Sequence, residues 1–233
     1  EHAEIPPWEF NDLGPNASTS SLADSHPLQQ SILSSQSKHG IAIGKGGNHW
    51  LYGGVLNGYL ARIVGAEPSR IPPLVDFDLN NLHPIETDAG IGTIEQYFAG
   101  DIPQSEKHSR SAYIDRYLAA TVAFGHACLL PDQFEWGITS TAKSYFLLQG
   151  LQKQYLRVPV STIEYHHNEQ LLNTNDALLS GAYTQGKIRI VYENGLEIHA
   201  NLGWEASWAV QYGDTTYSLG PGSFCAWNQE GLL

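Results

Sequence analysis

The chain has 233 residues, with 24 Asp and Glu against 12 Lys and Arg, and a formal net charge of −12. This acid excess argues against a nucleic-acid partner, because the chain has no stripe of Lys and Arg to displace counterions from a phosphate backbone. Apolar residues make up 42% of the chain, enough for a packed core. Charged residues make up only 15%, which excludes the charge-rich composition of disordered chains.

No apolar run approaches the ~18 residues of a membrane-spanning helix, so no span is predicted. Two cysteines, Cys128 and Cys225, either form one disulfide or are both buried thiols. The chain contains no Met and begins Glu1-His2-Ala3, with no visible signal peptide. We therefore expect further protein sequence upstream of Glu1.

The first 157 residues alternate short apolar runs with helical patterns. Apolar spacing predicts helices over 28–37, 113–124 and 139–156, and short apolar runs predict buried strands over 41–43, 74–79 and 127–131. Such alternation is typical of βα units on a parallel sheet. About three units are too few for a closed eight-unit barrel. Residues 1–157 are therefore predicted to form part of a (β/α)8 (TIM-type) barrel or a small open sheet.

From residue 158 the apolar period changes to two, which is typical of strands. An Asn194-Gly195 pair between two alternating runs predicts a hairpin. The expected strands are 162–165, 187–192, 196–201, 208–212, 215–219 and 223–227. Five or six short antiparallel strands favour a β-sandwich over 158–233. The expected fold class is thus α/β followed by all-β, in two domains.

The chain resembles the C-terminal half of a bacterial glycoside hydrolase in which a (β/α)8 barrel precedes a β-sandwich. The residues that carry this resemblance in the last strands are Trp208, Val210, Gly213, Tyr217, Leu219, Pro221 and Gly222, preceded by the hairpin over 192–196. Segments 7–9, 48–54, 74–79 and 83–90 resemble loops of barrel proteins of that kind. The resemblance implies a carbohydrate substrate, no cofactor, first barrel strands upstream of Glu1, and a secreted or periplasmic location.

Glycoside hydrolysis needs two carboxyl groups, which a barrel places at the C-terminal ends of its strands. Asp76 and Asp78 lie in a strand candidate, and alternation puts both on one face. Either one is a candidate nucleophile or base. Alternatively, one caps a loop and the other pairs with Arg62 or Arg70.

The partner acid is expected from Glu86, from Glu135 or from upstream sequence. Glu86 lies in a cluster with His83 and Asp88 that suits contact with sugar hydroxyls. The alternatives for this cluster are a plain loop, which we favour, or a metal site, which would need further ligands and is not expected. Asp132 and Glu9 are secondary candidates beside other strand ends.

Aromatic side chains supply the expected sugar platforms, because their rings stack on the apolar faces of pyranoses. We expect substrate contacts from His49, Trp50, Tyr52 and Trp136. Trp and Tyr are also common half-buried structural residues, so that alternative stays open.

The sequence therefore predicts a glycosidase that acts through paired carboxylates. The alternative is a non-catalytic carbohydrate-binding protein of the same architecture. A Ser-His-Asp hydrolase is disfavoured because no G-x-S-x-G motif is present. Residues 44–47 lack the order of a phosphate-binding loop. The oligomeric state is not predicted.

Overall fold

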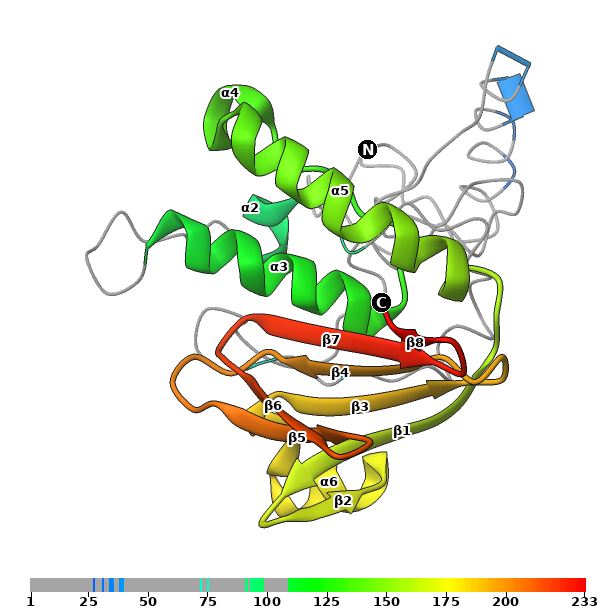
Figure 1. The fold of residues 1–233 in the computed structure, drawn as a ribbon. Coiled ribbons are helices and arrows are strands. Elements are labelled where there is room, and N and C mark those ends of the chain that lie inside the picture. The colour runs from blue at the N-terminus through cyan, green and yellow to red at the C-terminus, as the bar shows by residue number, and fades with distance from the viewer. Residues whose placement is uncertain are drawn as a thin grey trace, which may run out of the picture.

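The computed structural model describes residues 109–233, together with residues 27, 31, 34, 35, 38, 39, 72, 75, 91 and 93–98. Helices α2 to α5 precede the first strand in the described residues, and a further helix and a 3-10 turn lie among the strands (Figure 1). Their bounds are Ile94–Tyr97 (α2), Arg110–Phe124 (α3), Gln133–Trp136 (α4), Ile138–Tyr155 (α5), Thr174–Ser180 (α6) and Ala182–Gln185 (η5).

The two long helices confirm the predictions for 113–124 and 139–156 to within one turn. Helix α3 begins after Ser109, whose hydroxyl accepts a hydrogen bond from the Ala112 amide at 3.3 Å. It ends at Gly125, which has the left-handed φ of 69° that helix C-termini favour. On α5, Leu148 is buried, whereas Leu147, one position before it, is 46% exposed.

Eight strands form two antiparallel sheets in the described residues. Six of them form one sheet in the order β2-β1-β3-β4-β7-β8, and β5 and β6 pair with each other in a separate hairpin. The predicted antiparallel strands after residue 158 are confirmed. Their bounds are Val160–His167 (β1), Gln170–Leu172 (β2), Lys187–Tyr192 (β3), Glu197–Asn201 (β4), Trp208–Tyr212 (β5), Thr215–Leu219 (β6), Ser223–Asn228 (β7) and Gly231–Leu232 (β8).

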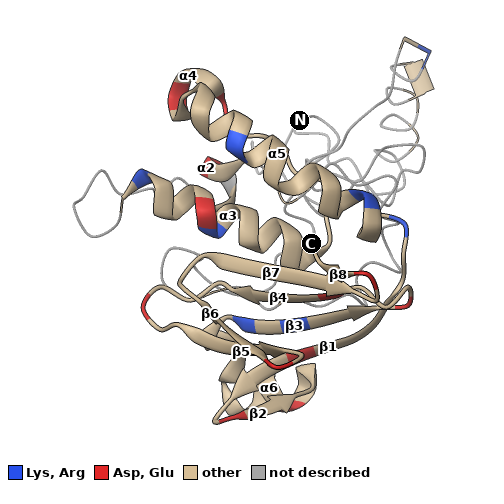
Figure 2. Ribbon diagram, in the orientation of Figure 1, with Lys and Arg blue, Asp and Glu red and all other residues tan. Residues whose placement is uncertain are grey.

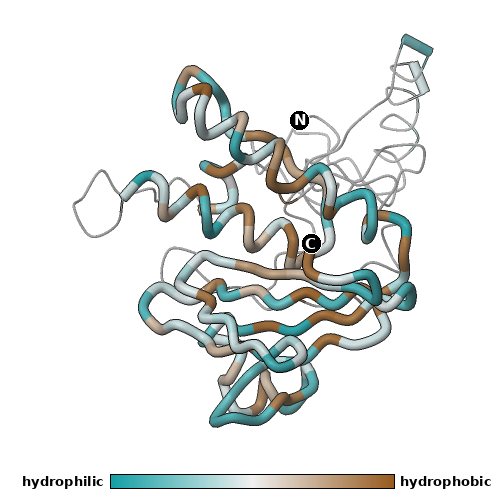
Figure 3. Tube along the Cα trace, viewed as in Figure 1, coloured by the Kyte–Doolittle hydropathy of each residue, from teal (hydrophilic) through white to brown (hydrophobic). Residues whose placement is uncertain are grey.

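The register of the large sheet assigns each side chain to one of two faces. Ile190 of β3 pairs with Ile198 of β4, and Arg189 pairs with His199. Because successive side chains point to opposite faces of a strand, the isoleucines share one face and Arg189 and His199 share the other. Along β3, buried and half-buried side chains alternate in the same way, and apolar and polar segments alternate along the central strands in Figure 3.

The apolar face of the sheet packs under α3, which also packs against α5, and this region holds the main core. Tyr117 and Leu118 of α3 are 0% and 1% exposed, and Ile190 and Ile198 are both 0% exposed. Removal of this apolar surface from water is the main favourable contribution to folding.

The hairpin β5–β6 covers part of the opposite face. Trp208, Val210, Leu219 and Trp227 form a second, smaller core between the hairpin and β7. The link between β4 and β5, residues 202–207, connects the large sheet to the hairpin. Strand β3 carries the basic residues Lys187 and Arg189, and acidic residues lie on neighbouring strands (Figure 2), so this second face combines charge with aromatic packing.

The strand predicted at 127–131 is wrong, because this segment pairs with no strand in the described part of the chain. Ala127, Cys128 and Leu129 are half-buried, and Leu130 is 43% exposed. The Leu129 carbonyl accepts a hydrogen bond from the Tyr117 hydroxyl at 2.8 Å. Between residues 109 and 157 the structure describes helices and no strand, so βα units are not seen there.

The earlier segments are described only at isolated residues. Residues 31, 34 and 35 are helical, within the predicted helix 28–37. Val75, in the predicted strand 74–79, is buried and outside any strand. Its amide donates to the Tyr165 hydroxyl at 2.8 Å, and that hydroxyl donates to the Val75 carbonyl at 2.6 Å. The predicted strand 41–43 lies outside the described residues.

Both cysteines, Cys128 and Cys225, are free and half-buried, in agreement with the thiol alternative. Burial raises the pKa of each thiol to about 11, which keeps both protonated at neutral pH. In the part of the chain that the structure describes, no helix combines the length and apolar character needed to cross a bilayer.

Candidate functional site

A shallow pocket with a mixed polar and aromatic lining lies beside the start of β3. Its volume is about 390 Å³, within the range of ~300–1,000 Å³ typical of small-molecule sites. One wall comes from η5 and the start of β3, and the other comes from the link between β4 and β5. We call it the Trp204 pocket; its lining residues are Pro72, Thr184, Gln185, Lys187, Gly203, Trp204, Glu205 and Ala206.

Close approach of two glycines holds the two walls together. Gly186 has a φ of +66°, and a Cβ atom there would lie 2.7 Å from Pro72 Cγ and 2.9 Å from Gly203 N. The Gly186 carbonyl accepts a hydrogen bond from the Leu202 amide at 2.6 Å. A side chain at residue 186 would therefore be strained and would push the walls apart.

Asn201 fixes the shape of the link between β4 and β5. Its side chain is fully buried, and its Nδ2 group donates to the Ala206 carbonyl at 2.9 Å and to the Leu219 carbonyl at 3.0 Å. Its Oδ1 atom accepts from the Gly203 amide at 3.1 Å. One amide side chain thus satisfies three backbone groups, which makes this loop a preorganised element.

The Trp204 indole is clamped against a buried guanidinium group. The Cζ atom of Arg116 lies 3.3 Å from the ring centroid, a close cation–π contact. Tyr113 packs edge-on against the same indole with ring centroids 5.2 Å apart. Trp204 is half-buried and is one of the residues that line the pocket.

Backbone carbonyl groups hold the Arg116 side chain, which is only 2% exposed. Its Nε donates to the carbonyls of Leu202 and Gly203 at 3.1 and 3.2 Å, and its Nη1 donates to the Ala112 carbonyl at 3.2 Å. Its Nη2 donates to Gly203 as well. Burial lowers the pKa of Arg116 to about 10, so the group still carries its positive charge at neutral pH.

The polar groups on the rim of the pocket differ in charge and in hydrogen-bonding capacity. Thr184 and Gln185 are exposed on η5, Lys187 is half-buried on β3, and Glu205 is exposed on the opposite wall. The Thr184 hydroxyl donates to the Gly181 carbonyl at 2.7 Å and keeps its acceptor lone pairs. Gln185 Nε2 lies 2.9 Å from His167 Nδ1, which orients its amide.

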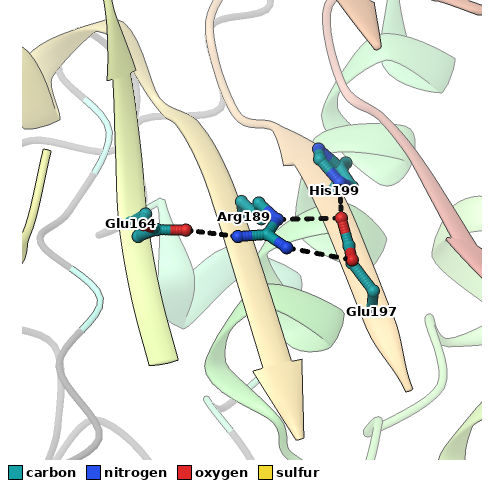
Figure 4. Close-up of polar contacts among 4 residues, drawn as sticks. All are labelled: Glu164, Arg189, Glu197 and His199. Carbon is teal, nitrogen blue, oxygen red and sulfur yellow. Dashed lines mark hydrogen bonds and ion pairs between the residues drawn. The ribbon is translucent and has the colours of Figure 1, made fainter. Parts of the chain in front are cut away.

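A network of ion pairs lies on the polar face of the sheet and joins β1, β3 and β4 (Figure 4). Arg189 Nη1 lies 2.5 Å from Glu164 Oε2, and its Nε and Nη2 atoms contact Glu197 at 2.8 and 3.1 Å. His199 Nε2 lies 2.7 Å from Glu197 Oε1. One guanidinium therefore engages both carboxyl groups.

These contacts set the charge state of Glu197. Burial alone would raise its pKa, but hydrogen bonds from His199 and Arg189 outweigh burial and lower the pKa to about 2. Hydrogen bonds to Glu197 raise the pKa of Arg189 further above its ordinary value, against the effect of burial. Two carboxylates that are both neutralised by one arginine are poorly suited to acid–base catalysis, so we assign the network a structural role.

A ladder of five rings joins this network to the hairpin. His166, Trp208, His199, Trp227 and Tyr212 follow one another with centroid separations of 5.4, 5.0, 4.7 and 5.0 Å. Trp208 and Trp227 are only 4% and 7% exposed, so they pack the hairpin onto the sheet rather than present a platform.

The predicted residues Glu135 and Trp136 lie on α4. Trp136 is 8% exposed, its indole N–H donates to Glu95 Oε1 at 2.6 Å, and the Arg110 guanidinium lies 4.5 Å above its ring. Burial alone would raise the pKa of Glu95, but hydrogen bonds, including those from Trp136 and Glu135, lower it. Glu135 is exposed, and its carbonyl accepts from Arg110 Nη2 at 2.7 Å. The roles predicted for both residues stay predictions.

Asp132, the secondary candidate, caps α4, where its carboxylate accepts a hydrogen bond from the Phe134 amide at 2.6 Å. Eight predicted site residues and the secondary candidate Glu9 lie outside the described residues: Asp76, Asp78, Glu86, His49, Trp50, Tyr52, His83 and Asp88. In the residues that are described, no group of three or more His, Cys, Asp or Glu side chains is arranged to hold a metal ion.

The sequence prediction missed the Trp204 pocket. One signal was available: a Gly203-Trp204-Glu205 string between two predicted strands, where a large aromatic residue in a polar link favours a contact site. A second was Arg116, a charged residue within the apolar stripe of the predicted helix 113–124. Neither signal indicates that the two residues stack on each other.

A larger groove of about 560 Å³ lies between α3, α5 and β7. Leu118, Leu147, Leu151 and several other apolar side chains line it. The ion pair between Lys143 Nζ and Asp115 Oδ1, 2.6 Å long, lies at its rim, and the two charges neutralise each other. This groove is less suited to a polyhydroxylated ligand than the smaller Trp204 pocket, because most of its walls offer no hydrogen-bonding side chains.

Comparison of the chain with models of protein families, with curated proteins and with solved structures gives no match.

Proposed function

We propose that this chain binds carbohydrate in the Trp204 pocket. The observation that carries the proposal is a half-buried indole, clamped by a buried arginine, in a pocket with a polar rim. The C–H groups on one side of a pyranose ring form an apolar face that packs well against an indole. A fixed indole loses little side-chain entropy when the sugar binds, which favours affinity.

The rim supplies the hydrogen bonds that sugar hydroxyls need. Gln185 offers both an amide donor and a carbonyl acceptor, Thr184 offers a hydroxyl, and Glu205 offers carboxylate acceptors. A hydroxyl group donates one hydrogen bond and accepts others, so a mixed rim satisfies it better than a rim of one kind. The pocket has room for one or two sugar units rather than for a long chain.

Loss of the indole tests the proposal. We expect the protein to bind members of a glycan panel measurably by calorimetry, and Trp204→Ala to lower the affinity at least tenfold, which is about 1.4 kcal/mol. Tyr145→Ala is a matched control, because Tyr145 is an aromatic residue 49% exposed on α5 and away from the pocket lining. Binding that Trp204→Ala leaves unchanged would overturn the proposal, provided that both variants keep the far-ultraviolet dichroism of the parent.

Hydrolysis is the second candidate function, and the resemblance of the sequence to glycoside hydrolases supports it. Glycosidases use two carboxyl groups on either side of the scissile bond. Here Glu135 is exposed on α4. Its partner would have to come from another candidate, because Glu95, within hydrogen-bonding reach of Glu135, is closer than the ~5–9.5 Å that separates the two carboxyl groups of a glycosidase. In this proposal the remaining catalytic candidates are Asp76, Asp78 and Glu86, and the chain is the last part of a glycoside-hydrolase-like barrel followed by its β domain.

The hydrolase candidate predicts a different result from the binding candidate. Glu135→Gln is expected to lower turnover of a bound glycan at least 100-fold without weakening binding, because it removes an ionisable group but keeps the size of the side chain. Glu205→Gln serves as the control at an exposed acid of the Trp204 pocket. If the parent protein binds a glycan but does not hydrolyse it, the hydrolase candidate is excluded and the carbohydrate-binding function stands.

A further inference from the structure

We propose that the sugar in the Trp204 pocket is anionic, a saccharide that carries a carboxylate group, and that Lys187 binds this carboxylate. The inference rests on the proposed function, because it names the class of ligand for the same pocket. The observation behind it is an excess of positive charge at the pocket in a strongly acidic chain.

The first positive charge lies behind the indole. Arg116 is 2% exposed, and its hydrogen bonds go to backbone carbonyl oxygens rather than to a carboxylate. The neighbouring acid on α3, Asp115, forms an ion pair with Lys143 at 2.6 Å. Asp115 acts on Arg116 electrostatically, but none of the hydrogen bonds of Arg116 reaches a carboxylate among the described residues. The field of this buried charge reaches the pocket across the ring of Trp204.

The second positive charge lies in the lining itself. Lys187 is half-buried at the start of β3, and no ion pair joins its ammonium group to an acid in the described part of the chain. A half-buried ammonium group is less screened by solvent than one at the surface, so a carboxylate next to it gains more interaction energy.

Other charges near Lys187 do not cancel this excess. Glu164 and Glu197, on the same face of the sheet, both engage Arg189, so their oxygens already have a partner. His166 faces Lys187, and its pKa is lowered, first by burial and then by Lys187, which keeps the imidazole neutral at neutral pH.

Glu205 is the one acid in the pocket lining. It lies on the wall opposite Lys187, so the pocket has a positive side and a negative side. This asymmetry orients the ligand, since a carboxylate placed near Glu205 would be repelled while one near Lys187 would be bound. With Arg116 behind the indole, the three charges give a local excess of one positive charge.

Because the whole chain is acidic, a preference for acidic sugars would indicate that positive charges at the pocket bind them. The formal net charge is −12, so the long-range field repels anions. A general attraction for polyanions is therefore not expected, and a tighter complex with an acidic sugar would have to come from the local charges at the site.

Matched pairs of sugars test the inference. The parent protein is titrated by calorimetry at low ionic strength with oligomers of galacturonate, glucuronate and mannuronate, and with the methyl esters of the same oligomers, which keep the sugar and linkage but remove the charge. We expect at least one acid to bind at least fivefold more tightly than its ester, and the ratio to decrease as salt is added.

Variants assign this preference to the pocket. Lys187→Gln is expected to bring the affinity ratio of acid to ester close to one, and Lys187→Arg to retain a preference for the acid. Lys143→Gln is the control, because Lys143 is a lysine paired with Asp115 away from the Trp204 pocket.

Each outcome has a separate meaning. Equal binding of acid and ester by the parent protein overturns the anionic ligand and leaves the carbohydrate-binding function in place. A preference for the acid that Lys187→Gln does not alter overturns the role of Lys187. No binding of any acid, ester or neutral glycan overturns the carbohydrate-binding function, and the inference with it.

Discussion

The two faces of the six-stranded sheet are built from the same strands but differ in what stabilises them. On the face below α3, residues such as Ile190 and Ile198 are fully buried in a continuous apolar core. On the other face, Arg189, Glu197 and His199 form ion pairs under a small aromatic cluster. The comparison teaches that one face is stabilised by apolar burial, while the other face is held by ion pairs and by aromatic packing against the hairpin.

The Trp204 pocket lies at the margin between these two regions. Arg116 reaches it from α3, which packs on the apolar face, and Lys187 reaches it from β3. Rigid elements on both sides hold the link between β4 and β5. The position of Trp204, a residue of this link, is therefore fixed by packing as the position of a core residue is. This arrangement fixes the walls of the proposed binding site in position without burying the site.

Substitutions on opposite faces of β3 test the difference in stability most strongly. Ile190→Ala is expected to lower the free energy of unfolding by about 2–5 kcal/mol, because it leaves a cavity in the main core. Val191→Ala, at the next residue on the polar face, is expected to cost clearly less because Val191 is half-buried. Urea unfolding followed by tryptophan fluorescence measures both values, and equal losses would contradict the difference between the two faces.

Gly186→Ala tests the close contact between the pocket walls. We expect a loss of about 1–3 kcal/mol from the strained φ, and further loss from the clash with Pro72 and Gly203. Gly213→Ala is the matched control, since Gly213 also has a positive φ of +57° but nothing lies within 4 Å of a Cβ atom there. Thermal unfolding should show a larger loss of stability for Gly186→Ala than for Gly213→Ala. Equal losses would mean that the contact between the walls adds nothing to stability.

Glu197→Gln tests how the ion-pair network contributes to stability at different pH values. We expect a smaller loss of stability than at Ile190 or Gly186, because the network is partly exposed. The pKa of Glu197 is about 2, below its ordinary value of 4.5. A depressed carboxyl pKa stabilises the fold fully above about pH 4.5, and this contribution is lost as pH falls through about 2. The parent protein should therefore lose stability relative to Glu197→Gln between about pH 5 and 2. Unfolding curves measured across this range check the prediction, and a constant difference would contradict it.

Much of the β part was predictable from local patterns. Strand β3 was predicted at 187–192, because its apolar residues alternate and the turn after it contains Asn194 and Gly195. Gly195 has the positive φ of 82° that this turn needs. In contrast, the pairing of β4 with β7 skips a whole hairpin, and no local pattern reveals such a partner.

The failures have physical reasons as well. The run 127–131 is apolar but only partly buried up to Leu130, and a short apolar run alone does not distinguish a strand from a loop. Helix α6 was missed although its caps, Asn173 and Gly181, are visible in the sequence, because its one buried residue, Ala177, leaves no apolar period to detect. The Trp204 pocket joins α3, η5 and the link before β5, and their proximity depends on the tertiary fold.

Indole resonances provide the most direct test of carbohydrate binding at Trp204. The protein is labelled with 15N, Trp204→Phe identifies the Trp204 Nε1–H signal by its absence, and the glycan that binds best is titrated in. We predict a saturable shift of the Trp204 signal, with the signals of the buried Trp208 and Trp227 nearly unchanged. A bound glycan that shifts other indole signals and leaves the Trp204 signal in place would contradict the account.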